Sequence, residues 1–178
     1  MVMADLEKPQ NKAHGLKVPS GKIELLRVFQ GELRGELQVV RLTKAQEASF
    51  DQLLKEYLGN DPEEVRKKAK DYSETCLVAT ENDNVIGIAY GWPRPMALPE
   101  KEYCLDGIAV QYNHWRKGVG SMLLKAFEKG VRGYGYERLS VGSAEGFAEK
   151  FYLKNGFTPQ CFKTYSGDRI VVRKEFSS

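Results

Sequence analysis

A glycine-rich turn near the middle of the chain has the residue types that hold an anion. Residues 114–123 read HWRKGVGSML, so two cations and two glycines directly precede apolar residues at helical spacing. The first turn of a helix has unpaired N–H groups and partial positive charge, and glycines let a ligand approach the backbone. Arg116 and Lys117 add full charge. This pattern predicts an anion site, although glycines alone favour a plain tight turn about equally.

Neither common nucleotide-binding loop fits this turn. A P-loop requires Gly-x-x-x-x-Gly-Lys-Ser/Thr, which the stretch lacks. A dinucleotide-binding fingerprint requires a third glycine three residues after Gly120, where Leu123 stands. What remains is a short arch of backbone N–H donors at the start of a helix, which suits a pyrophosphate.

The same stretch resembles the GNAT superfamily of acyl-CoA-dependent N-acetyltransferases. In that family a strand ends in a Leu/Ile-Ala-Val-like triplet, and Gln/Arg-x-x-Gly-x-Gly/Ala then opens a helix. Here the triplet is Ile108-Ala109-Val110, and Trp115 stands where the family has Gln or Arg. A second family element, Ala-x-x-Phe-Tyr-x-Lys-x-Gly-Phe, matches residues 148–157 throughout, with Glu145 in place of an upstream Asn. The resemblance covers roughly residues 36–178.

The resemblance implies that acetyl-CoA is the co-substrate and that no metal takes part. The strands at 102–110 and 138–144 would be parallel neighbours that splay apart. The pantetheine arm would enter the gap and pair with the backbone of Ile108 and Val110 like an added strand. The pyrophosphate would lie on the turn at 115–121. The predicted coenzyme-binding residues are Ile108, Ala109, Val110, Trp115, Arg116, Lys117, Gly118, Val119, Gly120, Ser121 and Tyr152.

Acetyl transfer to an amine needs a neutral nucleophile, a stabilised oxyanion and a stabilised thiolate. A lysine-like amine has a pKa of ~10.4, so a base or a water chain must take its proton. The leaving thiolate gains from a nearby hydroxyl donor, and the family's motif places Tyr152 at the coenzyme sulfur. A backbone N–H group at the splay, that of Val110, would stabilise the oxyanion.

The residue that takes the proton is predicted to be Asp106, four residues before Val110, where some family members carry a carboxylate. A bulge acid beside Gly107 is an equally good interpretation of the same residue. Glu102 and Cys104 share its strand face by alternation, which makes Glu102 the second choice as base. Cys104 is predicted to be a small core residue, and His114 is expected to be solvated or on the phosphate side.

Composition and patterning describe the scaffold that must position these residues. The chain has 178 residues, 42% of them hydrophobic and 29% charged, which suits one domain with a real core. A net charge of +3 with interleaved acids argues against a nucleic-acid binder. Three scattered cysteines and two histidines make a zinc site or a disulfide framework improbable. We also expect no membrane span and a cytoplasmic location.

Hydrophobic periodicity predicts the order of the elements. Residues 1–21 are expected to be a flexible leader and 22–35 an additional strand and turn, followed by the acetyltransferase domain at 36–178. Strands are predicted within 36–42, 75–92, 102–110, 138–144 and 159–176, the last with a turn at 166–168. Helices are predicted after Thr43, with an apolar stripe from Phe50 to Leu58, after Asp61, from Gly118 to Gly133 or Gly135, and within 146–156.

The predicted fold is therefore one α/β (α+β) domain, a mixed, mostly antiparallel twisted sheet with helices on both faces. The predicted function is transfer of an acetyl group from acetyl-CoA to a primary amine of a small molecule or peptide, in a ternary complex. A homodimer is compatible with this prediction. The alternative is a non-catalytic acyl-CoA-binding module of the same fold. A nucleic-acid-binding module has only the cations between Arg66 and Lys70 in its favour, and these also fit a solvated helix face.

Overall fold

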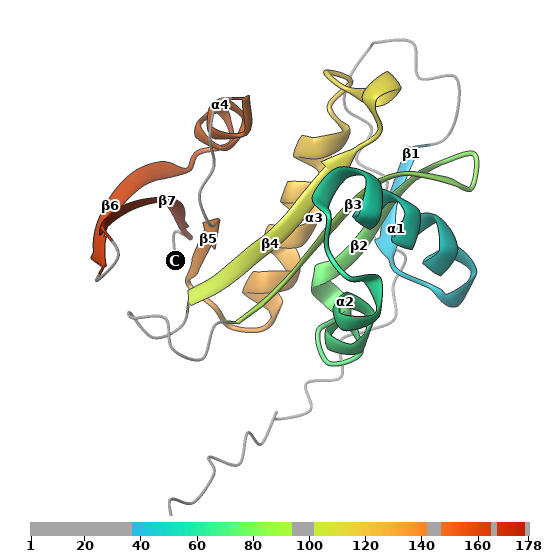
Figure 1. The fold of residues 1–178 in the computed structure, drawn as a ribbon, viewed down its shortest axis with the longest axis horizontal. Helices are drawn as coiled ribbons and strands as arrows, with labels where there is room; N and C mark the ends of the chain where they lie inside the picture. The colour runs from blue at the N-terminus through green and yellow to red at the C-terminus, as the bar shows by residue number, and fades with distance from the viewer. Residues whose placement is uncertain (1–36, 94–101, 142–146, 165–166, 177–178) are drawn as a thin grey trace, which may run out of the picture.

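The computed structural model describes residues 37–93, 102–141, 147–164 and 167–176. The predicted strand and turn within 22–35 therefore lie outside the described residues. The predicted turn at 166–168 lies partly outside them. The described residues form four α-helices and seven strands (Figure 1). In chain order they are β1 (Leu37–Arg41), α1 (Glu47–Leu53), α2 (Pro62–Ala69), β2 (Cys76–Glu81), β3 (Asn84–Pro93), β4 (Glu102–Val110), α3 (Val119–Gly133), β5 (Arg138–Val141), α4 (Phe147–Lys154), β6 (Thr158–Thr164) and β7 (Gly167–Glu175).

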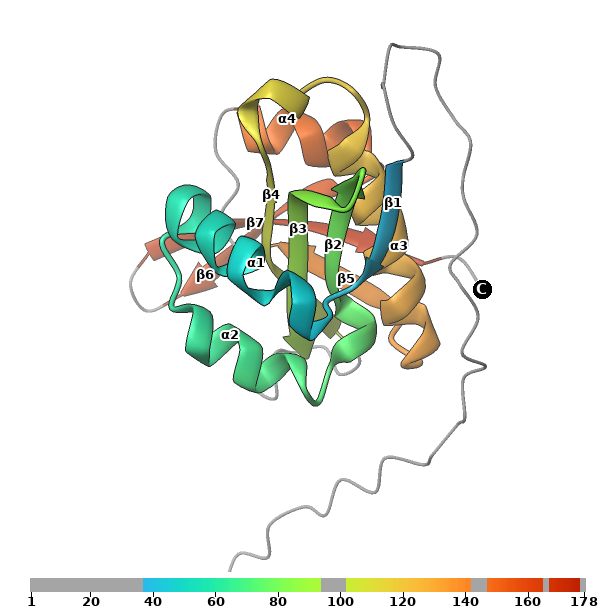
Figure 2. The ribbon, with the colours of Figure 1, turned by 90° about the vertical axis from the view of Figure 1, so that its right-hand side faces the viewer.

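The strands form one sheet in the order β1-β2-β3-β4-β5-β7-β6. Every neighbouring pair is antiparallel except β4 and β5, which are parallel. Helices α1 and α2 cover one face of the sheet, and α3 lies against the other (Figures 1 and 2). The mixed, mostly antiparallel sheet with helices on both faces is confirmed.

Helix α3 shows why this sequence places a helix on the sheet. Val119, Leu123, Phe127 and Val131 recur every four residues, so they share one face of the helix. All four are buried against strands β2 to β5. The helix begins after Gly118 and ends at Gly133, and Gly135 then takes a positive φ of 80°. Both predicted ends are confirmed.

Helices α1 and α2 cover the opposite face of the sheet, and the capping residues predicted for them form hydrogen bonds. The Gln46 side chain accepts hydrogen bonds from the Thr43 backbone N–H, at 3.2 Å, and from the Thr43 hydroxyl, at 2.9 Å. The Asp61 carboxylate accepts from the Glu63 N–H at 3.0 Å and so caps α2. Phe50, Leu53 and Leu54 are buried, and the chain after α1 continues as a π-helical turn, Leu54–Leu58.

The spacing of Val65, Ala69 and Tyr72 predicts that all three mark the inner face of α2, and this prediction is wrong for Tyr72. The helix ends at Ala69, so Tyr72 lies beyond it and packs edge-on against Tyr103, on the other face of the sheet. The cations after Val65 are mainly helix-surface residues, as the solvated-face interpretation predicts. Arg66 forms an ion pair with Asp51, and Lys68 forms one with Glu64. None of the helices that the structure describes is long and apolar enough to cross a membrane.

Candidate active site

The parallel strands β4 and β5 separate partway along β4. They pair from Glu102 opposite Arg138 to Leu105 opposite Val141. Among the described residues, 107–110 pair with β3 alone. The Gln111 N–H donates to the Ile86 carbonyl on β3, so by alternation the backbone groups of Ile108 and Val110 point away from β3. They face the side on which β5 has diverged, as the resemblance implies.

The glycine turn has a backbone that exposes the start of α3. Arg116 has a φ of 62° and Gly118 a φ of 86°, so two left-handed residues flank Lys117. Successive N–H groups in such a turn converge on one side, and the first turn of α3 adds further unpaired N–H groups. Arg116 and Lys117 are exposed. The turn therefore has the backbone conformation and the neighbouring cations that the predicted anion site requires.

The two glycines of the motif, Gly118 and Gly120, have different structural roles. A Cβ on Gly118 would meet no atom within 4 Å, so glycine suits this position through its positive φ. A Cβ on Gly120 would lie 3.3 Å from the Phe151 ring of α4. Gly120 therefore lets α4 approach the start of α3, which brings the second family element to the end of the glycine turn.

Trp115 makes a contact that its family position does not suggest. Its indole N–H donates to the Val110 carbonyl at 2.6 Å, and its ring centroid lies 5.0 Å from that of Tyr112. Both rings are largely exposed, Trp115 to 53% and Tyr112 to 74%. The side chain thus ties the turn to the end of β4, on the side that faces the gap.

The expected position of His114 was wrong. Its side chain is buried, with Nε2 at 3.1 Å from a Glu81 carboxylate oxygen and Nδ1 at 2.7 Å from the Asn113 side-chain oxygen. These contacts anchor the turn to the end of β2. His114 is therefore neither solvated nor turned toward the phosphate side, because its ring satisfies its polar atoms inside the protein.

Tyr152 is buried at the junction of α4 and the sheet. Its ring packs against Phe151 and Phe157, and burial raises the pKa of its hydroxyl well above 10, with a smaller contribution from the nearby Cys104 thiol. No hydrogen bond from a described residue contributes to that pKa shift. The phenol therefore stays protonated at neutral pH and can donate a hydrogen bond.

Asp106 occupies a bulge in β4 and also lines a pocket. Tyr90 on β3 lies opposite Gly107 and Gly91 lies opposite Leu105, so Asp106 is the extra residue. The bulge interpretation is therefore confirmed, and the side chain lies on the face that α1 and α2 cover. Asp106 is also the first residue of β4 past the pairing with β5. Its carboxylate thus lies beside the place where the strands part.

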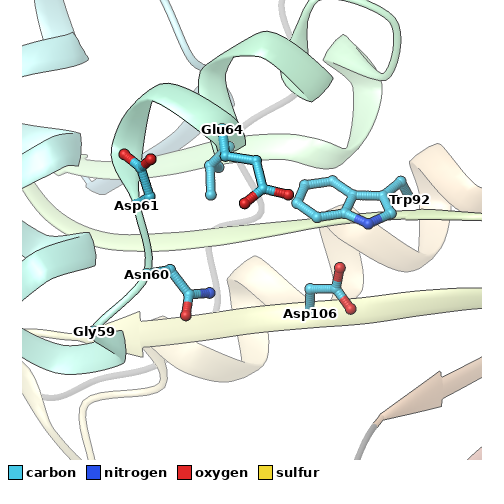
Figure 3. A pocket seen from close by; sticks show the side chains of 7 residues that line it. Gly59, Asn60, Asp61, Glu64, Trp92 and Asp106 are labelled. Carbon is cyan, nitrogen blue, oxygen red and sulfur yellow. The ribbon is translucent and has the colours of Figure 1, made fainter.

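The pocket at Asp106 has a volume of about 420 Å³ and lies between α2 and the strands β3 and β4 (Figure 3). Its lining residues are Gly59, Asn60, Asp61, Glu64, Val65, Trp92 and Asp106. Glu64 and Asp106 point into the same space from α2 and from β4, beside the Trp92 ring (Figure 3). The Asn60 side-chain amide contacts the Tyr90 hydroxyl at the pocket's back.

The second choice of base, Glu102, has a structural role instead. Its buried carboxylate accepts a hydrogen bond from Arg173 of β7 at 2.6 Å. The carboxylate is thus bound inside the protein by the ion pair between β4 and β7. Cys104 is buried, as expected of a core residue.

The sequence reasoning missed three polar residues of the pocket, Asn60, Asp61 and Glu64. Asp61 was interpreted only as a helix cap, which it is. Asp61, Glu64 and Val65 stand at i, i+3 and i+4, so they share one face of α2, and this spacing was the available signal. The family resemblance implies that the stretch 92–103 lines the substrate side, and its residues 94–101 lie outside the described residues.

The splayed parallel pair, the glycine turn that opens α3 and the packing of α4 on that turn define the class as a GNAT-type acetyltransferase fold. The chain belongs to the acetyltransferase (GNAT) family, whose model matches residues 40–157. No curated protein sequence matches the chain.

Solved structures of similar fold include Ard1 from Thermoplasma volcanium, with a TM-score of 0.65 and 18% identity over 80% of this chain and 99% of that one. The yncA acetyltransferase from Salmonella typhimurium, solved with its cofactor acetyl-CoA, has a TM-score of 0.65 and 17% identity over 80% and 95%. Arabidopsis thaliana Naa50, in complex with the bisubstrate analogue CoA-Ac-MVNAL, has a TM-score of 0.62 and 18% identity over 79% and 99%.

Proposed function

We propose that this protein transfers an acetyl group from acetyl-CoA to a primary amine by direct attack in a ternary complex. The observation that carries the proposal is the coincidence of three features. The backbone of β4 faces a gap beyond Leu105, the anion-binding turn begins past the end of that gap, and an acidic pocket opens where the gap starts. The coenzyme and the acceptor amine thus approach the same short stretch of β4 from different sides.

The coenzyme is held mainly by backbone groups. Ile108 faces the gap with peptide groups that can pair with the amides of pantetheine, and Val110 offers its N–H on the same side, because its carbonyl already accepts from the Trp115 indole. The arch from Trp115 to Ser121 offers its N–H groups to the pyrophosphate, with Arg116 and Lys117 supplying charge. The backbone groups of Ala109 point to β3, so this residue holds β4 in place while Ile108 and Val110 face the coenzyme. Val119 and Gly120 belong to the first turn of α3.

The amine enters from the pocket side and loses a proton toward Asp106, directly or through one water. Its nitrogen then forms a bond with the acetyl carbon while the carbonyl oxygen gains negative charge. The Val110 N–H, on the gap side of β4, is the donor that stabilises this oxyanion. The nitrogen loses its second proton to water as the amide forms, and the proton held by Asp106 passes to solvent after the reaction.

The carbon–sulfur bond breaks as the tetrahedral intermediate collapses, and the thiolate leaves. Tyr152 donates a hydrogen bond to that sulfur and lowers the energy of the developing charge. Because its pKa lies above the thiol value of about 8.5, the phenol shares its proton with the thiolate without giving it up permanently. The thiol finally takes a proton from solvent.

The proposal is tested by incubating the full chain with acetyl-CoA and amines of several classes, and following free thiol and acetylated product by mass spectrometry. The amines are polyamines, aminoglycosides, amino acids and peptides with free N-termini. Amine-dependent thiol release with a matching mass gain of one acetyl group supports transfer. Tight binding of acetyl-CoA without product in any class would favour the non-catalytic module.

A further inference from the structure

The pocket beside Asp106 has a charge that a neutral acceptor would not require. Three of its seven lining residues, Asp61, Glu64 and Asp106, carry carboxylates, and none of the seven is basic. Trp92 adds an aromatic wall, and a ring face attracts cations. A volume of about 420 Å³ is that of a small-molecule site.

A primary ammonium group already occupies part of this environment, supplied by the chain itself. Lys68 Nζ lies 2.8 Å from a Glu64 carboxylate oxygen and 4.3 Å from the centroid of the Trp92 ring. Lys68 does not line the pocket, but reaches its edge from the next turn of α2. The pair of Glu64 and Trp92 therefore forms a site that binds an alkylammonium group.

Lys68 can leave this site at little cost. The exposed fractions of the Lys68 and Glu64 side chains are 40% and 64%, and ion pairs this exposed contribute little to stability. An incoming ammonium group would keep both contacts of Lys68 and free the long lysine side chain to move in solvent. The exchange conserves the contacts at Glu64 and Trp92.

Resting on the acetyl-transfer function above, we propose that the acceptor is a dication, with one primary amine at Asp106 and a second ammonium group that replaces Lys68 between Glu64 and Trp92. The two carboxylates come from different elements and point into one space (Figure 3), so a flexible diamine or polyamine can span them. Acetylation removes the charge of the amine at Asp106. The product is then held at one end only, which favours its release.

The test compares α,ω-diaminoalkanes with n-alkylamines of matched length as acetyl acceptors. We expect the best diamine to exceed its matched monoamine by about tenfold or more in kcat/KM, and the advantage to appear in KM. Glu64→Gln should reduce this preference to about twofold. The control is Glu63→Gln, which removes the same charge from the same turn of α2 but does not line the pocket.

A substitution of Lys68 supplies a second test, in which the affinity for diamines should rise instead of fall. Lys68→Met removes the competing ammonium group, so it should lower the KM for diamines about threefold and leave that for monoamines unchanged. Lys67→Met is the control, because Lys67 is exposed on the same helix and has no contact with Trp92. A rise in diamine KM in Lys68→Met would show that Lys68 supports the pocket instead, and would overturn the proposal.

Equal use of diamines and monoamines would also overturn the proposal of a dication acceptor. So would an equal loss of the diamine preference in Glu64→Gln and Glu63→Gln. Calorimetric titration of diamines into the protein–CoA complex separates this inference from the function on which it rests. Diamine binding that needs Glu64, without any acetylated product, supports the dication site and contradicts the transfer. Transfer to monoamines without a diamine preference contradicts the dication site alone.

Discussion

Tyr152 differs from the other buried tyrosines in what surrounds its hydroxyl. The Tyr103 hydroxyl lies 2.6 Å from that of Thr75 and donates to the Gly91 carbonyl at 3.1 Å, and the Tyr90 hydroxyl contacts Asn60. Burial raises the pKa of all three, but at Tyr152 no such partner contributes to the shift. The first two hydroxyl groups are structural, whereas that of Tyr152 remains available to a ligand.

Tyr152→Phe should lower kcat by about 10²-fold with a nearly unchanged KM for acetyl-CoA, because it keeps the ring and removes the donor. The measurement is steady-state kinetics with an amine whose chemical step limits the rate. Tyr136→Phe, at a half-buried tyrosine between α3 and β5, is the control and should leave kcat unchanged. An unchanged rate in Tyr152→Phe would assign this side chain to packing.

Asp106→Asn keeps the shape of the side chain but cannot accept a proton, so it tests the base. We expect kcat to fall by about 10²-fold near neutral pH and to recover partly as pH rises toward ~10.4, where the free amine is plentiful. The pH profile of kcat is the measurement, with Asp83→Asn in the β2–β3 turn as control. A variant with lower thermal stability and a profile parallel to wild type would make Asp106 a structural bulge residue only.

At the scale of elements, the coenzyme site depends on how α3 begins. Gly118 precedes the helix in a left-handed conformation with open space around its Cα, and Gly120 admits the Phe151 ring of α4. Trp115 links the turn to the end of β4, and His114 links it to β2. The arch is therefore held from three elements before any ligand binds, which reduces the entropy lost on binding.

A matched pair of substitutions at Gly118 separates backbone strain from charge. Asn and Asp both tolerate positive φ better than other side chains, so each should cost about 1 kcal/mol of stability. At a hundred times its Kd, acetyl-CoA should stabilise wild type and Gly118→Asn by about 2.7 kcal/mol, roughly 5–10 °C in Tm. Gly118→Asp places a carboxylate at the anion site and should lose most of that shift. Equal shifts in both variants, measured by thermal unfolding, would exclude pyrophosphate from this turn.

At the scale of the whole molecule, the two faces of the sheet carry separate hydrophobic cores that share β3 and β4. Each core contains buried tyrosine, Tyr90 on the face of α1 and α2 and Tyr103 with Tyr152 on the other. Burial raises the pKa of Tyr90 to about 12. Because these phenols are harder to ionise folded than unfolded, the folded state loses stability as pH rises past about 10.

Tyr90→Phe should reveal this linkage. At pH 8 the variant should be less stable than wild type by about 1 kcal/mol, since it lacks the contact with Asn60. Between pH 10 and about 12, ionisation of Tyr90 in the unfolded state destabilises wild type but not the variant, so the difference should shrink. Urea denaturation at pH 8 and pH 11 measures both values. A constant difference would mean that Tyr90 titrates alike in the folded and unfolded states.

The sequence by itself determined the family, the element order and the position of the glycine turn that opens α3. These depend on short-range signals. Helical spacing from Val119 to Val131, the cap at Asp61 and the motif from Trp115 to Gly120 are each contained in one stretch of chain. Local backbone preference and one-sided burial fix such features before distant contacts form.

Tertiary structure alone decided which side chains meet. Asp106 and Glu64 are far apart in sequence and face one pocket because α2 packs on the face of the sheet where the Asp106 side chain lies. His114 is buried through a contact with Glu81, and Glu102 is paired with Arg173 on β7. Periodicity shows which face of a strand or helix a residue occupies, but not which partner faces it. Strand order, register and bulges set those partners, and they depend on contacts between residues distant in the chain.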